Sequence, residues 1–265
     1  MTGRIENKFG DLKQKNQKAL VVYLTAGDPG LETTRRLVLS LQEAGADIVE
    51  IGVPFSDPTA DGPIIQAASQ RALRSGVTLS GILDMIENLR SDCEIPIVLF
   101  GYYNPIFSYG SEQFALRAKK VGVDCILVVD LPPEESHELR QYTDPAGLDF
   151  ISLIAPTTND GRIRQISKNA TGFLYYISIT GVTGTAKPVA ENIKTDVARI
   201  RRTTSLPVVI GFGISAPVQA SEIASYADGI VVGSAFVNLI EKNSNAENLI
   251  QIASSFVRDI KSTLK

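Results

Sequence analysis

Short apolar runs alternate with helix-like segments along the whole chain, and this alternation limits the fold more than any other feature. Between the runs, segments such as 32–45, 111–122 and 246–264 carry apolar residues at i, i+3 and i+4, as amphipathic helices do. Alternation of this kind predicts a parallel sheet covered by helices. The runs are typical of strands buried on both faces, and the eight of them occupy residues 19–24, 47–52, 95–100, 124–129, 149–154, 173–178, 206–212 and 229–233.

The length of the chain decides how such a sheet is arranged. With 265 residues and 44% hydrophobic content, the chain can fill one large core. Eight strand-helix units in this length favour closure into a (β/α)8 TIM barrel over an open doubly wound sheet. We therefore predict an α/β protein with a single barrel domain over residues 1–265. Extra helices are expected, because residues 62–91 are long enough for two helices separated within 75–81.

Composition argues against several classes of function. The net charge of −3 and the pI near 5.4 give no basic surface for nucleic acid, and the basic cluster at 199–202 is typical of an exposed helix end. No stretch resembles a signal peptide or a membrane span, which favours the cytoplasm. Cys93 and Cys125 are far apart, and the only histidine, His137, falls on a predicted exposed helix. We therefore expect no disulfide framework and no metal site.

Glu50 interrupts the second apolar run. Alternation along that strand puts Ile48, Glu50 and Gly52 on one face and Val49 and Ile51 on the other. Because the aliphatic pair suits the helix-covered face, Glu50 should point into the barrel near the carboxyl end of its strand, where barrel enzymes carry their active sites. The alternative is a buried acid paired with a structural arginine or lysine, which would have to come from a loop because no predicted strand contains either residue.

The loops that follow the strands supply further candidate residues. Asp61 lies in a loop over the barrel mouth, but Asp61 or Gly62 could also cap the next helix, and spacing alone favours that structural role. Glycine-rich turns after the seventh and eighth runs, at 211–215 and 231–237, are suited to binding a phosphate. The loop at 178–192 has glycine hinges and small polar residues, which fit either a closing lid or an ordinary exposed loop.

Several motifs, in order along nearly the whole length, resemble the tryptophan synthase alpha chain family. They are YLTAGDPG (23–30), VEIGVPFSDPTADGPIIQAA (49–68), YYNPIF (102–107), VVDLPPEE (128–135), ITGVTG (179–184), GFGIS (211–215) and VVGSAFV (231–237). The resemblance implies cleavage of indole-3-glycerol phosphate to indole and glyceraldehyde 3-phosphate. It further implies no cofactor in this chain, and a partner beta chain that holds pyridoxal phosphate in an alpha-beta-beta-alpha assembly.

The resemblance also implies roles for individual residues. Glu50 matches the catalytic glutamate, Asp61 the aspartate that binds the indole N–H, and Tyr175 a tyrosine beside the glutamate. The other matches are substrate-binding or partner-facing. The substrate-binding set is Tyr23, Phe100, Leu127, Thr183, Gly184, Phe212, Gly213, Gly233 and Ser234, and the partner-facing set is Phe55, Asp57, Pro58, Asn104, Pro105, Asp130 and Pro132.

The partner surface is also suggested by three proline-rich loops, at 53–63, 102–107 and 130–135, which should emerge on the active-site face. Together they are expected to expose an apolar patch of the kind that marks an interface. It comprises Pro54, Phe55, Pro58, Pro105, Ile106, Pro132 and Pro133. The chain departs from the family pattern at Thr59, Gly101 and Val129, of which Thr59 and Val129 lie in loops that resemble the partner-facing surface of the family.

The implied chemistry is consistent with the residues that the chain offers. Carbon–carbon cleavage needs an electron sink, and this chain has no lysine in a predicted strand and no set of metal ligands. An indole ring protonated at C3 can act as the sink, with Glu50 as proton carrier and Asp61 stabilising the charge at N1. Two alternatives remain open: another sugar-phosphate barrel enzyme, or a barrel that mainly binds and activates a partner.

Overall fold

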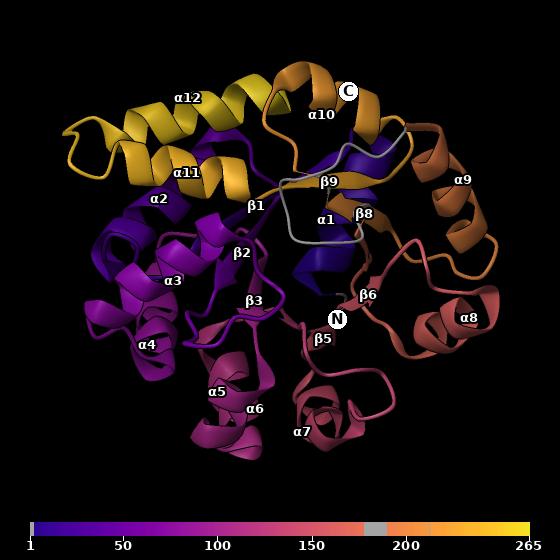
Figure 1. The fold of residues 1–265 in the computed structure, drawn as a ribbon, viewed down its shortest axis with the longest axis horizontal. Coiled ribbons are helices and arrows are strands. Elements are labelled where there is room, and N and C mark those ends of the chain that lie inside the picture. The colour runs from indigo at the N-terminus through magenta and orange to yellow at the C-terminus, as the bar shows by residue number, and fades with distance from the viewer. Residues whose placement is uncertain (1–2, 178–189, 212) are drawn as a thin grey trace.

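The computed structural model describes residues 3–177, 190–211 and 213–265, and the strands within them form one parallel sheet (Figure 1). Their order in the sheet is β5-β4-β3-β2-β1-β9-β8-β7-β6. Their bounds are β1 (Ala19–Thr25), β2 (Ile48–Gly52), β3 (Ile97–Gly101), β4 (Cys125–Val128), β5 (Asp149–Phe150), β6 (Ser152–Ile154), β7 (Leu174–Ile177), β8 (Val208–Gly211) and β9 (Gly229–Val232).

The first and last strands of that order are two pieces of one strand. Only Ile151 separates β5 from β6, and its N–H donates to the carbonyl of Ile126 at 3.0 Å. Because β5 pairs with β4 and β6 pairs with β7, the two ends of the sheet meet at Ile151 and the barrel closes. The (β/α)8 prediction is therefore confirmed, with an interruption in the fifth strand. The single-domain organisation of residues 1–265 stays a prediction.

Helices surround the strands in Figure 1. The expected pair within 62–91 is α3 and α4, and the side chain of Thr78 caps α4 by accepting from the N–H of Gly81 at 3.1 Å. None of the described helices combines the length and hydrophobicity needed to cross a membrane. The helices are α1 (Arg4–Gln14), α2 (Leu31–Ala44), α3 (Pro63–Arg74), α4 (Leu79–Leu89), α5 (Tyr103–Tyr109), α6 (Ser111–Val121), α7 (His137–Ala146), α8 (Asp160–Asn169), α9 (Ala190–Arg201), α10 (Pro217–Ala224), α11 (Ser234–Lys242) and α12 (Leu249–Lys261).

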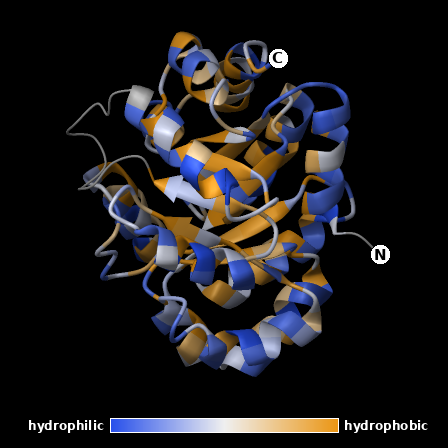
Figure 2. Ribbon diagram, turned by 90° about the vertical axis from the view of Figure 1, so that its right-hand side faces the viewer, coloured by the Kyte–Doolittle hydropathy of each residue, from blue (hydrophilic) through white to orange (hydrophobic). Residues whose placement is uncertain are grey.

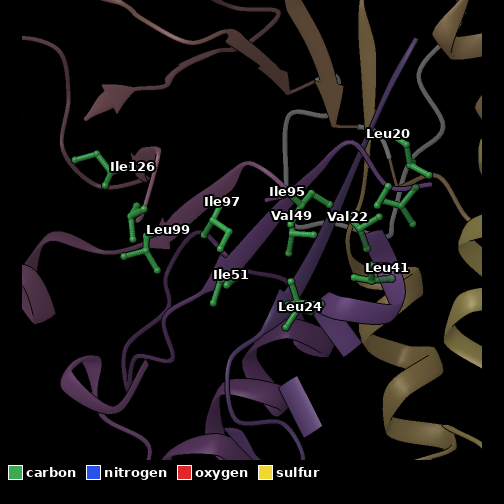
Figure 3. Packing of buried hydrophobic residues seen from close by; sticks show 14 of the residues in the cluster. Leu20, Val22, Leu24, Leu41, Val49, Ile51, Ile95, Ile97, Leu99 and Ile126 are labelled. Atoms are coloured by element: carbon green, nitrogen blue, oxygen red, sulfur yellow. The ribbon is translucent and has the colours of Figure 1, made fainter. Parts of the chain in front are cut away.

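Alternate residues of each strand belong to two separate cores. On β2, Val49 and Ile51 pack in the outer core between the strands and the helices, together with Leu41 of α2 (Figure 3). Ile48 belongs to the inner core inside the barrel. Figure 2 shows the same organisation, with hydrophobic strands in the middle and mixed helix surfaces outside. This is the two-sided burial expected of parallel strands.

The inner core is closed by α1 at the N-terminal end of the barrel. Ile5, Phe9 and Leu12 of α1 belong to this core, and the ring of Phe9 lies 5.8 Å from that of Phe173. Above them the barrel interior is filled by aliphatic side chains and by Cys125. The open space is therefore left at the carboxyl ends of the strands, where the strands lead into the loops that carry the candidate residues.

Candidate active site

Glu50 is the middle residue of β2, and its side chain lines a cavity of about 320 Å³. The residue is 0% exposed, and neither carboxyl oxygen has a hydrogen-bond partner among the described residues. Among the described residues, no arginine or lysine therefore forms the structural ion pair that was the alternative role for Glu50. Burial raises the pKa of Glu50 to about 8, so the carboxyl group is mainly protonated at neutral pH.

Asp61 lies at the end of the loop between β2 and α3, and its side chain also lines the cavity. The N-cap of α3 is Gly62, and no side chain caps this helix, so the predicted capping role does not apply to Asp61. Instead Oδ2 of Asp61 accepts a hydrogen bond from the hydroxyl of Tyr102 at 3.1 Å. Burial raises the pKa of Asp61 to about 6, and the bond from Tyr102 opposes that rise. Asp61 is therefore mainly ionised at neutral pH, whereas Glu50 keeps its proton.

Tyr102 is a site residue that the sequence analysis did not single out. Its hydroxyl oxygen accepts from the backbone N–H of Ala60 at 3.0 Å while its proton goes to Asp61. One phenol thus holds both the backbone and the carboxylate of the loop. The only signal in the sequence is its place directly after the third strand, within the YYNPIF motif.

Aromatic side chains from three strands form walls of the cavity. Tyr23 of β1 and Phe100 of β3 pack edge to face, with ring centroids 5.2 Å apart. Tyr175 of β7 lies on another wall. Burial is the main cause that raises its pKa well above the usual range, and the negative charge of Glu50 in its ionised form is the second cause. A flat aromatic ligand can therefore reach both carboxyl groups between apolar surfaces.

The remaining lining residues include several that the sequence analysis did not name. Leu127, expected in the indole pocket, is fully buried in the inner core and is not one of the residues that line the cavity. Val129, noted only as a departure from the family pattern, does line it. The additional lining residues are Ala60, Ile65, Leu153, Ile177, Gly211 and Val231.

Three of the residues expected to bind phosphate, Gly213, Gly233 and Ser234, line the same cavity. Gly233 is the N-cap of α11, and Ser234 is its first residue, so backbone N–H groups of the helix start are close to the cavity. Gly213, after β8, has a φ of +67°, a conformation that favours glycine. These features suit an anion. Thr183, Gly184, Phe212 and residues 178–189 of the candidate lid loop lie outside the described residues, whereas residues 190–192 of that loop begin α9.

No group of three or more histidine, cysteine, aspartate or glutamate side chains that could hold a metal was found within 3–177, 190–211 and 213–265. His137 is exposed on α7, and both cysteines are buried.

The expected partner-facing residues follow β2, β3 and β4. Those after β2 and β4 lie in loops, whereas the predicted loop at 102–107 is wrong, because Asn104 and Pro105 lie in α5. Asp57, Asn104 and Asp130 are exposed, whereas Phe55, Pro58, Pro105 and Pro132 are partly exposed. Two members of the predicted apolar patch are wrong, because Pro54 is buried and Ile106 of α5 packs in the outer core. Phe107, next to Ile106, is 65% exposed instead. Helical geometry turns Ile106 inward and Phe107 outward.

Comparisons with known proteins agree with this geometry. The family model described as tryptophan synthase alpha chain matches residues 9–265. The tryptophan synthase alpha chain of Geobacter sp. (strain M21) is 53% identical over 258 residues, covering 97% of this chain and 96% of the relative. That of Geotalea uraniireducens is 50% identical over 262 residues, covering 99% and 98%.

Solved structures with the same fold include members of this family. Tryptophan synthase subunit alpha from Legionella pneumophila has a TM-score of 0.92 and 36% identity, covering 99% of this chain and 98% of its own. The tryptophan synthase complex from Pyrococcus furiosus gives a TM-score of 0.84 and 35% identity, covering 93% of this chain and 99% of its own. From the match over nearly its full length, the chain belongs to the tryptophan synthase alpha chain family, lyases of tryptophan biosynthesis whose reaction is the cleavage of indole-3-glycerol phosphate.

Proposed function

We propose that this chain cleaves indole-3-glycerol phosphate to indole and glyceraldehyde 3-phosphate in the cavity around Glu50 and Asp61. The observation that carries the proposal is the Glu50 carboxyl group, which is fully buried, unpaired within the described residues, and directed into a cavity with apolar walls. A buried and unpaired acid destabilises the fold, and a general acid-base function explains why the site retains it.

Glu50 acts first as an acid and then as a base. Its raised pKa keeps the proton at neutral pH, and donation of that proton to C3 of the indole ring creates an indolenine cation. The Glu50 carboxylate then takes the proton from the hydroxyl group on the carbon attached to the ring. The O–H electron pair forms the aldehyde C=O bond, the C–C bond breaks, and its electron pair returns to the ring. Indole and glyceraldehyde 3-phosphate leave, and Glu50 is protonated again.

Asp61 stabilises the cation by accepting a hydrogen bond from the ring N–H. This role needs an ionised carboxylate, and the bond from Tyr102 favours that form. The phosphate of the substrate would bind at the start of α11, at Gly233 and Ser234, with Gly213 close by. The family resemblance adds Thr183, Gly184 and Phe212 to the substrate-binding residues, and Tyr175 to the wall beside Glu50.

The test is indole release from indole-3-glycerol phosphate by the purified chain. Glu50→Gln should reduce the rate by about 10²-fold to 10⁴-fold, the usual contribution of general acid-base catalysis, because the amide carries no transferable proton. Glu247→Gln is the matched control, since Glu247 is exposed between α11 and α12. Near-normal cleavage by Glu50→Gln would contradict the assignment. No cleavage by the wild-type chain, alone or with a beta chain, would favour the alternative of a binding and activating subunit.

We propose further that the chain works in the cytoplasm in an alpha-beta-beta-alpha assembly with a beta chain that holds pyridoxal phosphate. Solved relatives include tryptophan synthase complexes, which supports a beta chain partner. The docking surface would comprise exposed and partly exposed residues of the loops after β2 and β4 and of α5, on the active-site face. They are Phe55, Asp57, Pro58, Asn104, Pro105, Asp130 and Pro132.

Docking on this face would order the loop that carries Asp61 and let indole pass between the subunits without entering solvent. Adding a beta chain should therefore accelerate cleavage, because positioning a catalytic group lowers the barrier. Asp57→Ala and Pro132→Ala should weaken the acceleration and leave the slow basal rate roughly intact. Glu6→Gln on α1, at the closed end of the barrel, is the control. An unchanged wild-type rate, with no complex on gel filtration, would refute the partner proposal.

A further inference from the structure

Gly52, the last residue of β2, lies beneath the ring of Tyr23. The register of β1 and β2 pairs Tyr23 with Glu50 and Thr25 with Gly52, so Tyr23 and Gly52 are diagonal neighbours. A Cβ atom built on Gly52 would lie 2.1 Å from the hydroxyl oxygen of Tyr23 and 2.6 Å from Cζ. Both distances are far below van der Waals contact. The tyrosine ring therefore occupies the space that any side chain at position 52 would need.

Backbone conformation does not explain the glycine at this position. Gly52 ends a regular parallel strand and is not one of the described glycines with positive φ, such as Gly213. An alanine could adopt the same backbone. What position 52 cannot accommodate is the volume of a methyl group, because of Tyr23.

Tyr23 has little freedom to move away from an added methyl group. Its ring packs edge to face on Phe100 at 5.2 Å, its hydroxyl lies 3.5 Å from the hydroxyl of Thr25, and the residue is 5% exposed. With these sides occupied, the open direction is the cavity that Tyr23, Glu50 and Asp61 line together. A side chain at position 52 would therefore displace the ring into the substrate space.

A second wall of the cavity has the same arrangement. Tyr175 of β7 lies over Gly211 of β8, where an added Cβ would be 2.5 Å from Cε1 and 2.6 Å from the hydroxyl oxygen. In both cases the glycine is the last residue of a strand and the tyrosine comes from the neighbouring strand. At both walls the tyrosine ring occupies the space that a side chain at the glycine would fill, and the ring therefore leaves the cavity wide.

We propose that Gly52 is a specificity-determining positioning residue that acts through Tyr23 and sets the width of the cavity for the fused ring of indole. The inference rests on the proposed function, because it takes the ring to bind beside Tyr23, Phe100 and the two acids. It assigns Gly52 no contact with the substrate. The phosphate end, at Gly233 and Ser234, should not depend on it.

The experiment measures indole binding to Gly52→Ala, Tyr23→Leu and the double variant. The chain contains no tryptophan, so the fluorescence of bound indole can be followed without interference from protein indole groups. Overpacking by one methyl group should weaken indole binding about tenfold or more in the Gly52→Ala variant. Binding of glycerol 3-phosphate, which has no ring, should change by less than about twofold, because uncoupled sites behave independently.

A double-mutant cycle shows whether the effect passes through Tyr23. When Tyr23 is replaced by leucine, the same Gly52→Ala change should alter indole binding by less than about twofold, because the clashing ring is absent. Tyr23→Phe is the matched comparison: it removes the hydroxyl but keeps Cζ, which lies 2.6 Å from the added methyl group, and should not rescue. Equal effects of Gly52→Ala with tyrosine or leucine at position 23 would overturn the proposal.

Folding is checked by thermal unfolding of each variant. If Gly52→Ala alone does not fold, recovery of folding and of indole binding in the double variant with Tyr23→Leu supports the proposal, whereas failure of both variants to fold refutes it. Cleavage by the wild-type chain is measured separately. If the wild-type chain cleaves the substrate while the cycle shows no coupling, only the role of Gly52 is wrong. If the wild-type chain neither cleaves the substrate nor binds indole, the proposed function itself is wrong.

Discussion

Replacing Glu50 by glutamine should make the protein more stable at neutral and alkaline pH while it removes the catalytic proton. The reason is the position of the carboxyl group, which is fully buried and unpaired within the described residues. Ionisation of such a group inside the protein loses the solvation that water gives it in the unfolded chain. Glutamine has nearly the same shape and cannot ionise.

The size of the effect follows from the pKa. The ordinary value is 4.5 and burial raises it to about 8, and each pKa unit corresponds to about 1.4 kcal/mol, so ionised Glu50 lowers the free energy of unfolding by about 5 kcal/mol. At pH 7 Glu50 is ionised in the unfolded chain but still mainly protonated in the folded protein. Folding must therefore bind a proton, which lowers the free energy of unfolding by about 3 kcal/mol. Either figure is a large part of the roughly 5–15 kcal/mol that stabilises a typical domain.

The sign of the pH dependence is fixed by the direction of the shift. Because the folded pKa is raised, the folded state binds more protons than the unfolded state between 4.5 and about 8. With respect to Glu50, the free energy of unfolding is therefore highest below pH 4.5, and this stability is lost as the pH rises through about 8. The advantage of Glu50→Gln should therefore be small in acid and grow across this window.

Urea unfolding followed by circular dichroism, from about pH 5 to about pH 9, measures the difference. Glu247→Gln, at an exposed position, controls for the loss of one negative charge and should remain within about 0.5 kcal/mol of the wild type. A constant difference between wild type and Glu50→Gln over this range would show that the carboxyl group does not titrate with a raised pKa. A difference that shrinks as the pH rises would refute the burial argument directly.

Three further results are expected from the same structure. The pH profile of kcat/KM should be bell-shaped, rising as Asp61 ionises near pH 6 and falling as Glu50 loses its proton near pH 8; a flat profile would contradict the two roles. Tyr102→Phe removes the bond that lowers the pKa of Asp61, so the acidic limb should move to higher pH and not to lower pH. Arg90→Met should lower the free energy of unfolding by about 3 kcal/mol in urea titrations, because it removes the ion pair at 2.8 Å with buried Asp124, which keeps Arg4 at 3.1 Å, and the hydrogen bonds from Arg90 to backbone carbonyls; a loss below about 1 kcal/mol would show that these contacts contribute little.

The sequence predicted features that depend on local periodicity. The inward direction of Glu50 followed from the alternation of Val49 and Ile51 along one strand, and the barrel followed from eight repeats of strand and helix. The interruption of the fifth strand at Ile151 was not predicted, because that apolar run continues through the break without a glycine or proline.

Features that depend on contacts between distant segments could not be predicted in this way. The bond from Tyr102 to Asp61 joins positions 41 residues apart, and helix-capping preferences, which are local, favoured a different role for Asp61. The clash that excludes a side chain at Gly52 exists only because the barrel brings Tyr23 beside it. Burial within the assembled barrel also determines how far the pKa of each acid rises.

The absence of lysine and arginine from the described strands acquires a functional meaning once the chemistry is considered. An arginine beside Glu50 would satisfy the carboxylate and stabilise the fold, but it would lower the pKa and leave no proton to donate at neutral pH. Apolar walls have the opposite effect: they keep the acid protonated and reduce stability. Asp61 needs the reverse condition, and the hydroxyl of Tyr102 favours its ionised form without adding a positive charge. One cavity can therefore hold a neutral acid and a carboxylate together, as the proposed cleavage requires.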